Sequence, residues 1–174
     1  MGTRAGSGQA AFLAATDPLG KITLDTNAYA YYLKNEPAGH AELTAQLLLR
    51  CAKGDLEIEI PGIVELELLV LPYRSRDPGQ VTLIRRLTRE HPGITTSPIS
   101  ELVLHLAAEL RALTPLRAPD ALIAASAAIH GSEVLITNDA DFAVLNRLAN
   151  VQLMARGRRP FSLPTVLFMD DFSD

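Results

Sequence analysis

Acidic side chains stand where short apolar segments end, and they are the residues whose placement could support chemistry. Asp25 directly follows the segment Lys21–Leu24, and Asp139 and Asp141 follow Glu133–Thr137. In an open α/β sheet, ligands bind outside the carboxyl ends of the strands. An acid after a strand also has a structural use, the Asx turn, in which the side chain caps its own backbone. Taken alone, Asp25 is equally consistent with both uses.

Two further acids belong to predicted helices. Glu67 lies in the very apolar segment Ile63 to Leu71, where an isolated charge is costly to bury without a cation or a metal. Glu65 competes for the same role, because residues two positions apart point to different sides of a helix. Asp120 follows Pro119 in the first turn of another predicted helix, where the helix dipole already favours an acid. Periodicity alone therefore does not decide which of these acids is functional.

Strand-end acids and helix acids that meet at one sheet edge would form a nest of carboxylates. Such a nest repels itself unless protons or metal ions occupy it. Oxygen ligands without histidine or cysteine companions point to Mg²⁺ or Mn²⁺. Cys51 is the single cysteine, so neither an intramolecular disulfide nor a cysteine-based zinc site can form.

Strand-like and helix-like segments alternate along the chain. The predicted strands are 21–24, 56–60, 94–97 and 133–137, with 151–154 and 165–169 as further candidates. The predicted helices are 29–33, 40–52, 63–71, 80–90, 100–113, 120–130 and a short one ending near 148. Segment 56–60 alternates apolar and polar residues, as a half-buried strand does. The alternation predicts an α/β fold, a three-layer α/β/α sandwich with a mostly parallel sheet.

Length and composition favour one domain. The chain has 174 residues, 48% of them hydrophobic, which is enough to bury a core. Residues 1–20, rich in glycine and alanine, predict a flexible or extended leader, and residues 21–174 a single domain. The net charge of −4 and the pI of about 5.6 argue against a protein that coats nucleic acid. They do not argue against a nuclease, since a metal-binding carboxylate cluster makes its own site acidic.

Membrane insertion and secretion are not expected. No apolar run approaches the roughly 20 residues that a transmembrane helix needs. The N-terminus has no continuous apolar region of the kind found in signal peptides. A cytoplasmic protein is the plain interpretation.

Four stretches in order resemble the motifs of PIN-domain ribonucleases, and the closest type is the VapC toxin of bacterial and archaeal toxin–antitoxin pairs. The stretches are Leu24-Asp-Thr-Asn27, Ile60-Pro-Gly-Ile-Val-Glu-Leu-Glu-Leu-Leu69, Pro119-Asp-Ala-Leu-Ile-Ala-Ala-Ser-Ala127 and Thr137-Asn-Asp-Ala-Asp-Phe142. Each motif is loose by itself, but four in order at suitable spacing are fairly specific. They span most of the chain, and the family's parallel α/β/α sandwich matches the alternation of strands and helices.

The resemblance implies a role for each matched residue. The four acids that would bind metal and catalyse are Asp25, Glu67, Asp120 and Asp139, with Asp141 as an accessory acid. Glu67 is preferred over Glu65 because the family's acid directly precedes a Leu-Leu pair, as Glu67 does here. Asn27 and Thr137 would be supporting polar residues. Two departures from the family are the longer leader before Lys21 and the basic loop Arg156 to Pro160, which lengthens the C-terminal part.

The function implied is a metal-dependent endoribonuclease that hydrolyses RNA with one or two Mg²⁺ or Mn²⁺ ions. A bound metal lowers the pKa of a water and neutralises charge on the phosphate. Single-stranded or looped RNA is the expected substrate, since it exposes its backbone and bases. Arg111 and Arg117 are candidate phosphate contacts, with ordinary solvated surface charge as the alternative. The resemblance also implies a cognate antitoxin and a homodimer.

Two other functions compete with this one. An aspartyl-phosphate on Asp25 would suit a phosphatase, but such enzymes want a second Asp at the position that Asn27 occupies. The other is a non-catalytic PIN-like module that binds RNA or a partner protein. The complete set of acids argues against it, because degenerate modules usually lose acids.

Overall fold

Five short parallel strands form the central sheet of the computed structural model, which describes residues 7–148, 153–154 and 161–172. The order across the sheet is β3-β2-β1-β4-β5, and every neighbouring pair is parallel. The strands are β1 (Lys21–Leu24), β2 (Glu57–Pro61), β3 (Ile94–Ser97), β4 (Val134–Thr137) and β5 (Thr165–Phe168). The central strand β1 and its neighbour β4 are almost wholly buried, as expected for a parallel sheet covered on both faces.

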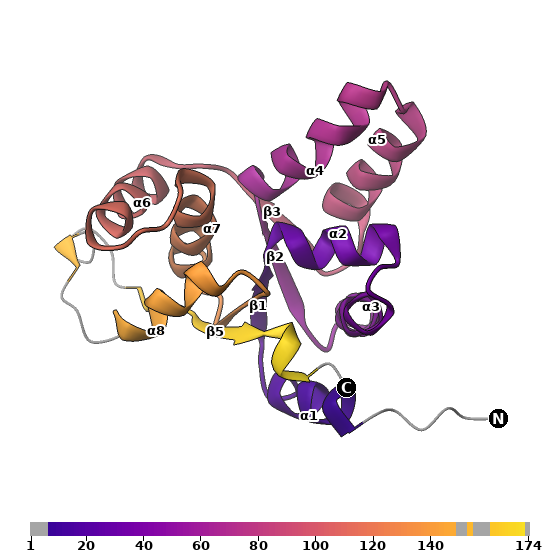
Figure 1. Ribbon diagram of the computed structural model, residues 1–174, viewed down its shortest axis with the longest axis horizontal. Coiled ribbons are helices and arrows are strands. Elements are labelled where there is room, and N and C mark those ends of the chain that lie inside the picture. Colours follow the sequence, from indigo (N-terminus) through magenta and orange to yellow (C-terminus); the bar gives the residue numbers. More distant parts are fainter. Residues whose placement is uncertain (1–6, 149–152, 155–160, 173–174) are drawn as a thin grey trace.

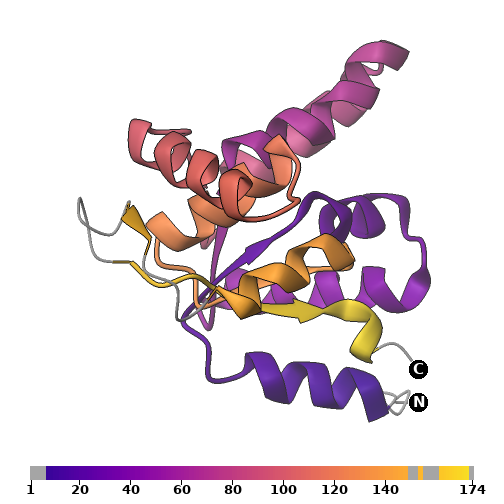
Figure 2. The same cartoon turned by 60° about the vertical axis from the view of Figure 1, so that its left-hand side comes forward.

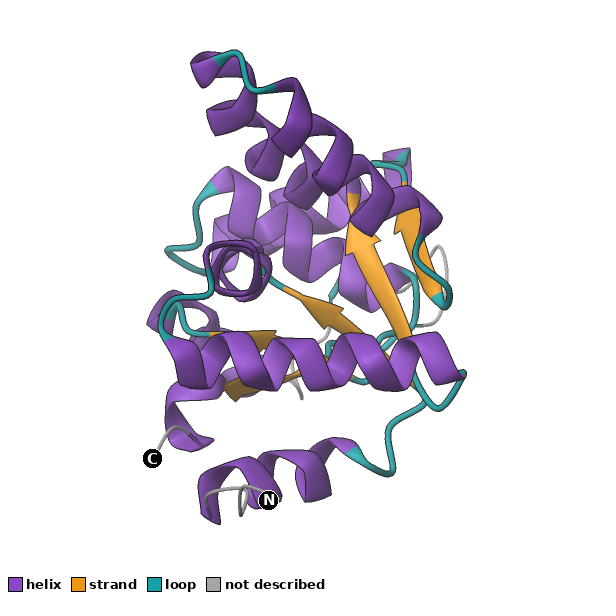
Figure 3. Cartoon of the chain, turned by 90° about the vertical axis from the view of Figure 1, so that its right-hand side faces the viewer, coloured by secondary structure: helices purple, strands orange, loops and turns teal. Residues whose placement is uncertain are grey.

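Helices cover both faces and complete the predicted three-layer sandwich. Figure 1 shows α6 and α7 on one side of the sheet and α2 and α3 on the other, and in Figure 3 the strands lie between helices. The helical elements before β3 are α1 (Ser7–Thr16), α2 (Thr26–Lys34), α3 (Ala38–Lys53), α4 (Gly62–Ser75), α5 (Pro78–Arg85) and the π-helical turn η1 (Arg86–Glu90). Those after β3 are α6 (Glu101–Leu113), α7 (Ala118–Ile129), η2 (Ala140–Ala143), α8 (Val144–Arg147) and η4 (Met169–Phe172).

The expectation of a flexible or extended leader is wrong for the described part of residues 1–20. Residues 7–16 form helix α1, which lies beside the C-terminal turn η4 (Figure 1). Phe12 is fully buried, and its ring meets that of Phe172 edge to face, with 5.2 Å between ring centroids. Burial of an aromatic ring is a large favourable term, and the alanines around it favour a helix once that contact is made.

Helix α4 is longer than predicted. It continues through Pro72 to Ser75, and Arg76 ends it in the left-handed conformation, with its N–H bonded toward the carbonyls of Pro72 and Tyr73. A proline inside a helix removes one backbone hydrogen bond, and α4 nevertheless continues past Pro72, which is buried. The gap between the predicted helices 63–71 and 80–90 therefore shrinks to the two residues Arg76 and Asp77, and Figure 2 shows α4 and α5 extending beyond the sheet.

The other expectations have mixed outcomes. Strand β2 alternates as predicted at Glu57, which is exposed, but Glu59 is fully buried. In the predicted strand 151–154, only Leu153 and Met154 are described, and neither is in a strand. The basic loop 156–160 lies outside the described residues. Among the helices of the described ranges, none has the length and apolar character to cross a membrane.

Candidate active site

The carboxyl ends of β1 and β4 lie side by side, and the predicted acids gather there. One surface cleft of about 390 Å³ is lined by Asp25, Thr26, Asn27, Glu67, Arg117, Pro119, Asp120 and Asp139. All four principal acids of the sequence prediction line this cleft. They come from the ends of β1 and β4 and from helices α4 and α7, so the fold alone brings them together.

Asp25 is held in the cleft by three hydrogen bonds. It caps the N-terminus of α2, with its Oδ1 accepting from the Thr26 backbone N–H at 2.6 Å. Its Oδ2 accepts from Asn27 Nδ2 at 2.8 Å and from Thr137 Oγ1 at 2.7 Å. The capping use and the position in the cleft are therefore compatible in one side chain. Asn27 and Thr137 both contact Asp25, as their predicted supporting role requires.

Burial sets the charge state of Asp25. Loss of solvation raises the pKa of Asp25 from its ordinary value of 3.8 to about 6. The hydrogen bonds from Thr137 and Thr26 oppose this rise, whereas the nearby charges of Asp120 and Glu67 add to it. A bound proton or a nearby cation would therefore stabilise this buried carboxylate.

Asp120 stands in the first turn of α7 with one oxygen unsatisfied. Its Oδ2 is buried and has no hydrogen-bond partner. Burial raises the pKa of Asp120, and the charge of Asp139 raises it further. Arg117 Nε lies 3.7 Å from that oxygen and Arg117 Nη2 lies 3.9 Å from Asp139 Oδ2. Those distances are too long for hydrogen bonds, and the Arg117 side chain is 74% exposed, so its attraction to the acids is weak.

The two glutamates of α4 point to different partners. Glu67 lines the cleft, where its Oε2 accepts a hydrogen bond of 2.5 Å from Thr26 Oγ1. Glu65 instead pairs with Arg89 of η1 and accepts from Thr88 Oγ1 at 3.1 Å. The Arg89 hydrogen bond lowers the pKa of Glu65 below its usual value. The choice of Glu67 over Glu65 for the cleft thus agrees with this geometry.

Three predicted residues are not among those that line the cleft, and one of them, Thr137, is fully buried and contacts Asp25. Asp141 is exposed, and its backbone N–H donates to Asp139 Oδ1 at 2.9 Å, so it braces Asp139 through the chain rather than lining the cleft itself. Arg111 lies in the last turn of α6, exposed and not among the lining residues. Conversely, Thr26 contacts both Asp25 and Glu67 and was not predicted as a site residue. The only signal for it is its place between Asp25 and Asn27.

The chemistry of the cleft fits a hard divalent cation. Within the described residues, no three histidine, cysteine, aspartate or glutamate side chains already have the spacing of a metal site. However, two of the buried side-chain oxygens that lack a hydrogen-bond partner in those residues are Asn27 Oδ1 and Asp120 Oδ2, both at this cleft. Carboxylate and amide oxygens are the ligands that Mg²⁺ and Mn²⁺ prefer. A cation here would satisfy these oxygens and relieve the repulsion among the acids.

We expect the metal-free protein to lose stability as the pH rises from about 3.8 to about 6, because of Asp25. Its folded-state pKa of about 6 lies above the ordinary 3.8. Its stabilising contribution is therefore fully present below the unfolded-state pKa and is lost as the pH rises through the folded-state pKa. The loss is on the order of 3 kcal/mol. Denaturation in EDTA across this pH range measures the effect. The unfolding free energy of the wild type should drop below that of Asp25→Asn as the pH approaches neutral. Parallel plots of unfolding free energy against pH for the two proteins would contradict the raised pKa.

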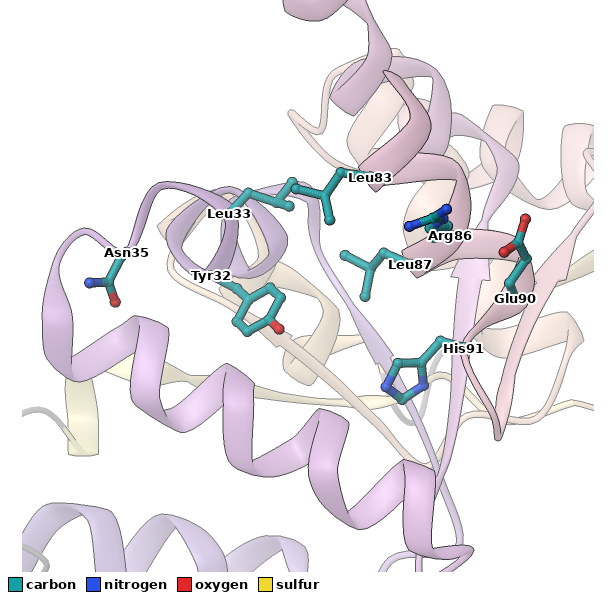
Figure 4. Close-up of a pocket in the computed structure, with 8 residues that line it drawn as sticks. All are labelled: Tyr32, Leu33, Asn35, Leu83, Arg86, Leu87, Glu90 and His91. Carbon is teal, nitrogen blue, oxygen red and sulfur yellow. The ribbon is translucent and has the colours of Figure 1, made fainter. Parts of the chain in front are cut away.

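A larger cavity lies away from the acids. It measures about 630 Å³ and is formed between α2 and the α5–η1 segment by Tyr32, Leu33, Asn35, Leu83, Arg86, Leu87, Glu90 and His91 (Figure 4). Half of these residues are leucine or tyrosine, the other half are polar or charged, and none is one of the four principal acids. The larger cavity therefore does not coincide with the cleft in which the predicted acids converge.

Comparisons with known proteins agree with this arrangement. The PIN domain family model matches residues 22–148, well over half of the chain, and includes all four acids. No curated protein sequence matches the chain. A chain of the VapBC2 structure from Rickettsia felis, bound to a promoter DNA fragment, is 21% identical with a TM-score of 0.59, covering 85% of this chain and 98% of its own.

Two further solved structures share the fold. A chain of VapBC-1 from nontypeable Haemophilus influenzae is 21% identical with a TM-score of 0.58, covering 86% of this chain and 98% of its own. A chain of a toxin–antitoxin complex from Klebsiella pneumoniae is 23% identical with a TM-score of 0.54, covering 70% of this chain and 90% of its own. With its family match, its parallel sheet and its cleft of four acids, the chain belongs to the PIN domain family.

Proposed function

We propose that this protein is a metal-dependent endoribonuclease and the toxin component of a toxin–antitoxin pair. The observation that carries the proposal is the cleft in which Asp25, Glu67, Asp120 and Asp139 meet. Two buried oxygens there have no hydrogen-bond partner, and the pKa of Asp25 is raised to about 6. Perturbed carboxylates converging in a cleft are typical of functional sites.

The four acids are proposed to hold one or two Mg²⁺ or Mn²⁺ ions. When bound, such an ion supplies a water of lowered pKa and neutralises charge on the scissile phosphate. The chain contributes orientation: the Thr26 hydroxyl holds Glu67, while Thr137 and Asn27 hold Asp25. Arg117, exposed at the rim of the cleft, is suited to attract the phosphate backbone of RNA. Arg111 is the weaker candidate for that contact, because it does not line the cleft.

The proposed partners rest on the family and on its solved members. Structures of similar fold are VapBC and toxin–antitoxin complexes, and this supports a cognate antitoxin that covers the acidic cleft. A homodimer is proposed from the same resemblance. The proposed substrate is single-stranded or looped RNA, which exposes its phosphates to a surface cleft. A toxin that cuts cellular RNA acts in the cytoplasm, and we infer that location from the proposed function.

We expect the purified protein to cut RNA only when a divalent metal is present. Cleavage of a labelled structured RNA should occur with Mg²⁺ or Mn²⁺, fall to background in EDTA and return when excess metal is added. A parallel preparation of Asp25→Asn serves as the control for contaminating nucleases. Cutting that persists in EDTA and in Asp25→Asn would sink the assignment. RNA or partner binding without cleavage at any metal concentration would favour the non-catalytic PIN-like module.

A further inference from the structure

A second carboxylate network lies inside the protein, away from the cleft. Glu59, in the middle of β2, has no exposed surface, and no other aspartate or glutamate among the described residues is as completely buried. Its neighbours Ile58 and Ile60 point to the other face of the sheet, because side chains alternate along a strand. Glu59 therefore lies on the face that α7 covers.

Hydroxyl groups from three elements donate to Glu59. Thr23 Oγ1 of β1 donates to Oε2 at 2.6 Å, and Ser126 Oγ of α7 donates to Oε1 at 2.8 Å. Ser97 Oγ at the end of β3 also donates to Oε1. His130 Nδ1 is 3.6 Å from Oε1, but it lies closer to the Ser126 carbonyl, at 2.9 Å. The carboxylate is thus satisfied chiefly by neutral hydroxyls.

The cost of this arrangement calls for a reason other than stability. Removing a carboxylate from water is expensive, and replacing buried ionic groups by apolar ones of similar volume is often neutral or stabilising. Directional hydrogen bonds to a buried charge instead fix one arrangement of the elements that they connect. The elements connected here are β1, β3 and α7.

Helix α7 needs such a constraint because its side chains are small. Six of its twelve residues are alanine, from Ala118 to Ala128. Alanine offers little of the interdigitation by which larger side chains fix the rotation and axial position of a packed helix. The bond from Ser126 to Glu59 supplies a directional contact on a face that Ser126 shares with the buried Ile123 and Ile129.

The same helix begins at the cleft. Asp120 is six residues before Ser126, about 9 Å along the helix axis. On the sheet side, Thr23 precedes Asp25 by two residues in β1, and Thr23 is the register partner of Glu59. One buried carboxylate therefore connects the strand that ends at Asp25 to the helix that starts at Asp120.

We propose that Glu59 is a positioning residue, which holds α7 in the register that presents Asp120 to the other acids of the cleft. This role rests on the proposed function, since it supposes that Asp120 helps to bind metal. Glu59 itself contacts neither metal nor substrate. Its effect passes through Ser126 and the backbone of α7.

The test is Mn²⁺ affinity, measured by calorimetry on the full chain without RNA. In the triple variant Glu59→Leu, Ser97→Ala and Ser126→Ala, the network is replaced by apolar groups, and Thr23 keeps its bond to Ser132. We expect the thermal midpoint to stay the same or rise. The Kd for Mn²⁺ should rise on the order of tenfold, the usual effect of losing a group that orients a metal ligand.

Two variants separate positioning from general stability. Glu59→Gln can keep the network, because its carbonyl oxygen can accept from both serines while its amide donates to Thr23, and it should retain wild-type affinity. Ile129→Val, a cavity-forming change in the same helix outside the network, should lower the thermal midpoint and leave the Mn²⁺ affinity unchanged. Equal losses of affinity in Ile129→Val and the triple variant would show that affinity merely follows stability and would overturn the proposal.

The remaining outcomes also decide. A folded triple variant with wild-type Mn²⁺ affinity overturns the positioning role and leaves the proposed function intact. If the triple variant does not fold, Ser126→Ala replaces it, because Ser97 and Thr23 still donate to Glu59. Weakened Mn²⁺ affinity in Ser126→Ala supports the positioning role, and unchanged Mn²⁺ affinity refutes it. If the wild type binds no Mn²⁺, the proposed function fails and the positioning role fails with it. If Asp120→Asn binds Mn²⁺ as tightly as the wild type, Asp120 is not a metal ligand and the positioning role alone fails.

Discussion

Asp25→Asn is expected to lower the single-turnover rate of RNA cleavage by at least about 100-fold. Asparagine keeps the shape of the side chain but loses the negative charge that would bind a divalent cation. Changes to groups that only orient a metal ligand cost about 10- to 100-fold, so loss of a ligand itself should reach the upper end of that range or exceed it. Asp25 is the strongest choice because it is the most deeply buried of the four acids in the cleft.

The stability of Asp25→Asn distinguishes a lost function from a lost fold. At neutral pH the wild-type carboxylate is ionised against its burial, with a pKa of about 6. The neutral amide avoids that penalty, although it gives up one of the oxygens that accept from Thr26, Asn27 and Thr137. We therefore expect the metal-free variant to unfold at a denaturant concentration no lower than the wild type at neutral pH. A stable variant that still cuts RNA within about tenfold of the wild-type rate would remove Asp25 from the metal site.

The alternation of segments was sufficient to predict the layers of the fold. Strand β4 is an apolar run that ends at Thr137, strand β1 is a mixed segment followed by Asp25, and helices separate the strands. Parallel topology follows from such alternation, because each crossover requires a connecting segment. The same topology explains why Asp25 and Asp139, far apart in the sequence, end at one edge.

Features that depend on contacts between distant segments were not predictable. Helix α1 is held by contacts with distant segments: Phe12 meets Phe172, near the opposite end of the chain, and Arg50 of α3 donates to Thr16. Glu59 sits in a pattern typical of a half-buried strand, and nothing local distinguishes it from the exposed Glu57. Its burial is stabilised by hydrogen bonds from Thr23, Ser97 and Ser126, which belong to three separate elements. Patterns along the chain show where a side chain can point, but not which groups will meet it.

Glu67→Gln and Glu65→Gln form a matched pair with opposite expected results. Glu67 lines the cleft and accepts from Thr26, so its change to glutamine should lower cleavage by about 100-fold or more and leave stability nearly unchanged. Glu65 pairs with Arg89 on the other side of α4, so its change should leave cleavage close to wild type. That variant should lose about 1 kcal/mol of unfolding free energy, since the ion pair is only partly buried.

The pH dependence of stability provides the control for this pair. Arg89 holds the pKa of Glu65 below its usual value, so the stabilisation is present at neutral pH and is lost as the pH falls through that lowered pKa. The stability gap between the wild type and Glu65→Gln should therefore close in acid. Cleavage assays and denaturation curves on both variants measure the two effects separately. If only Glu65→Gln abolishes cleavage, the second acid of the site is Glu65 and not Glu67. The hydrogen bond from Thr26 to Glu67 is then only a structural contact between α2 and α4.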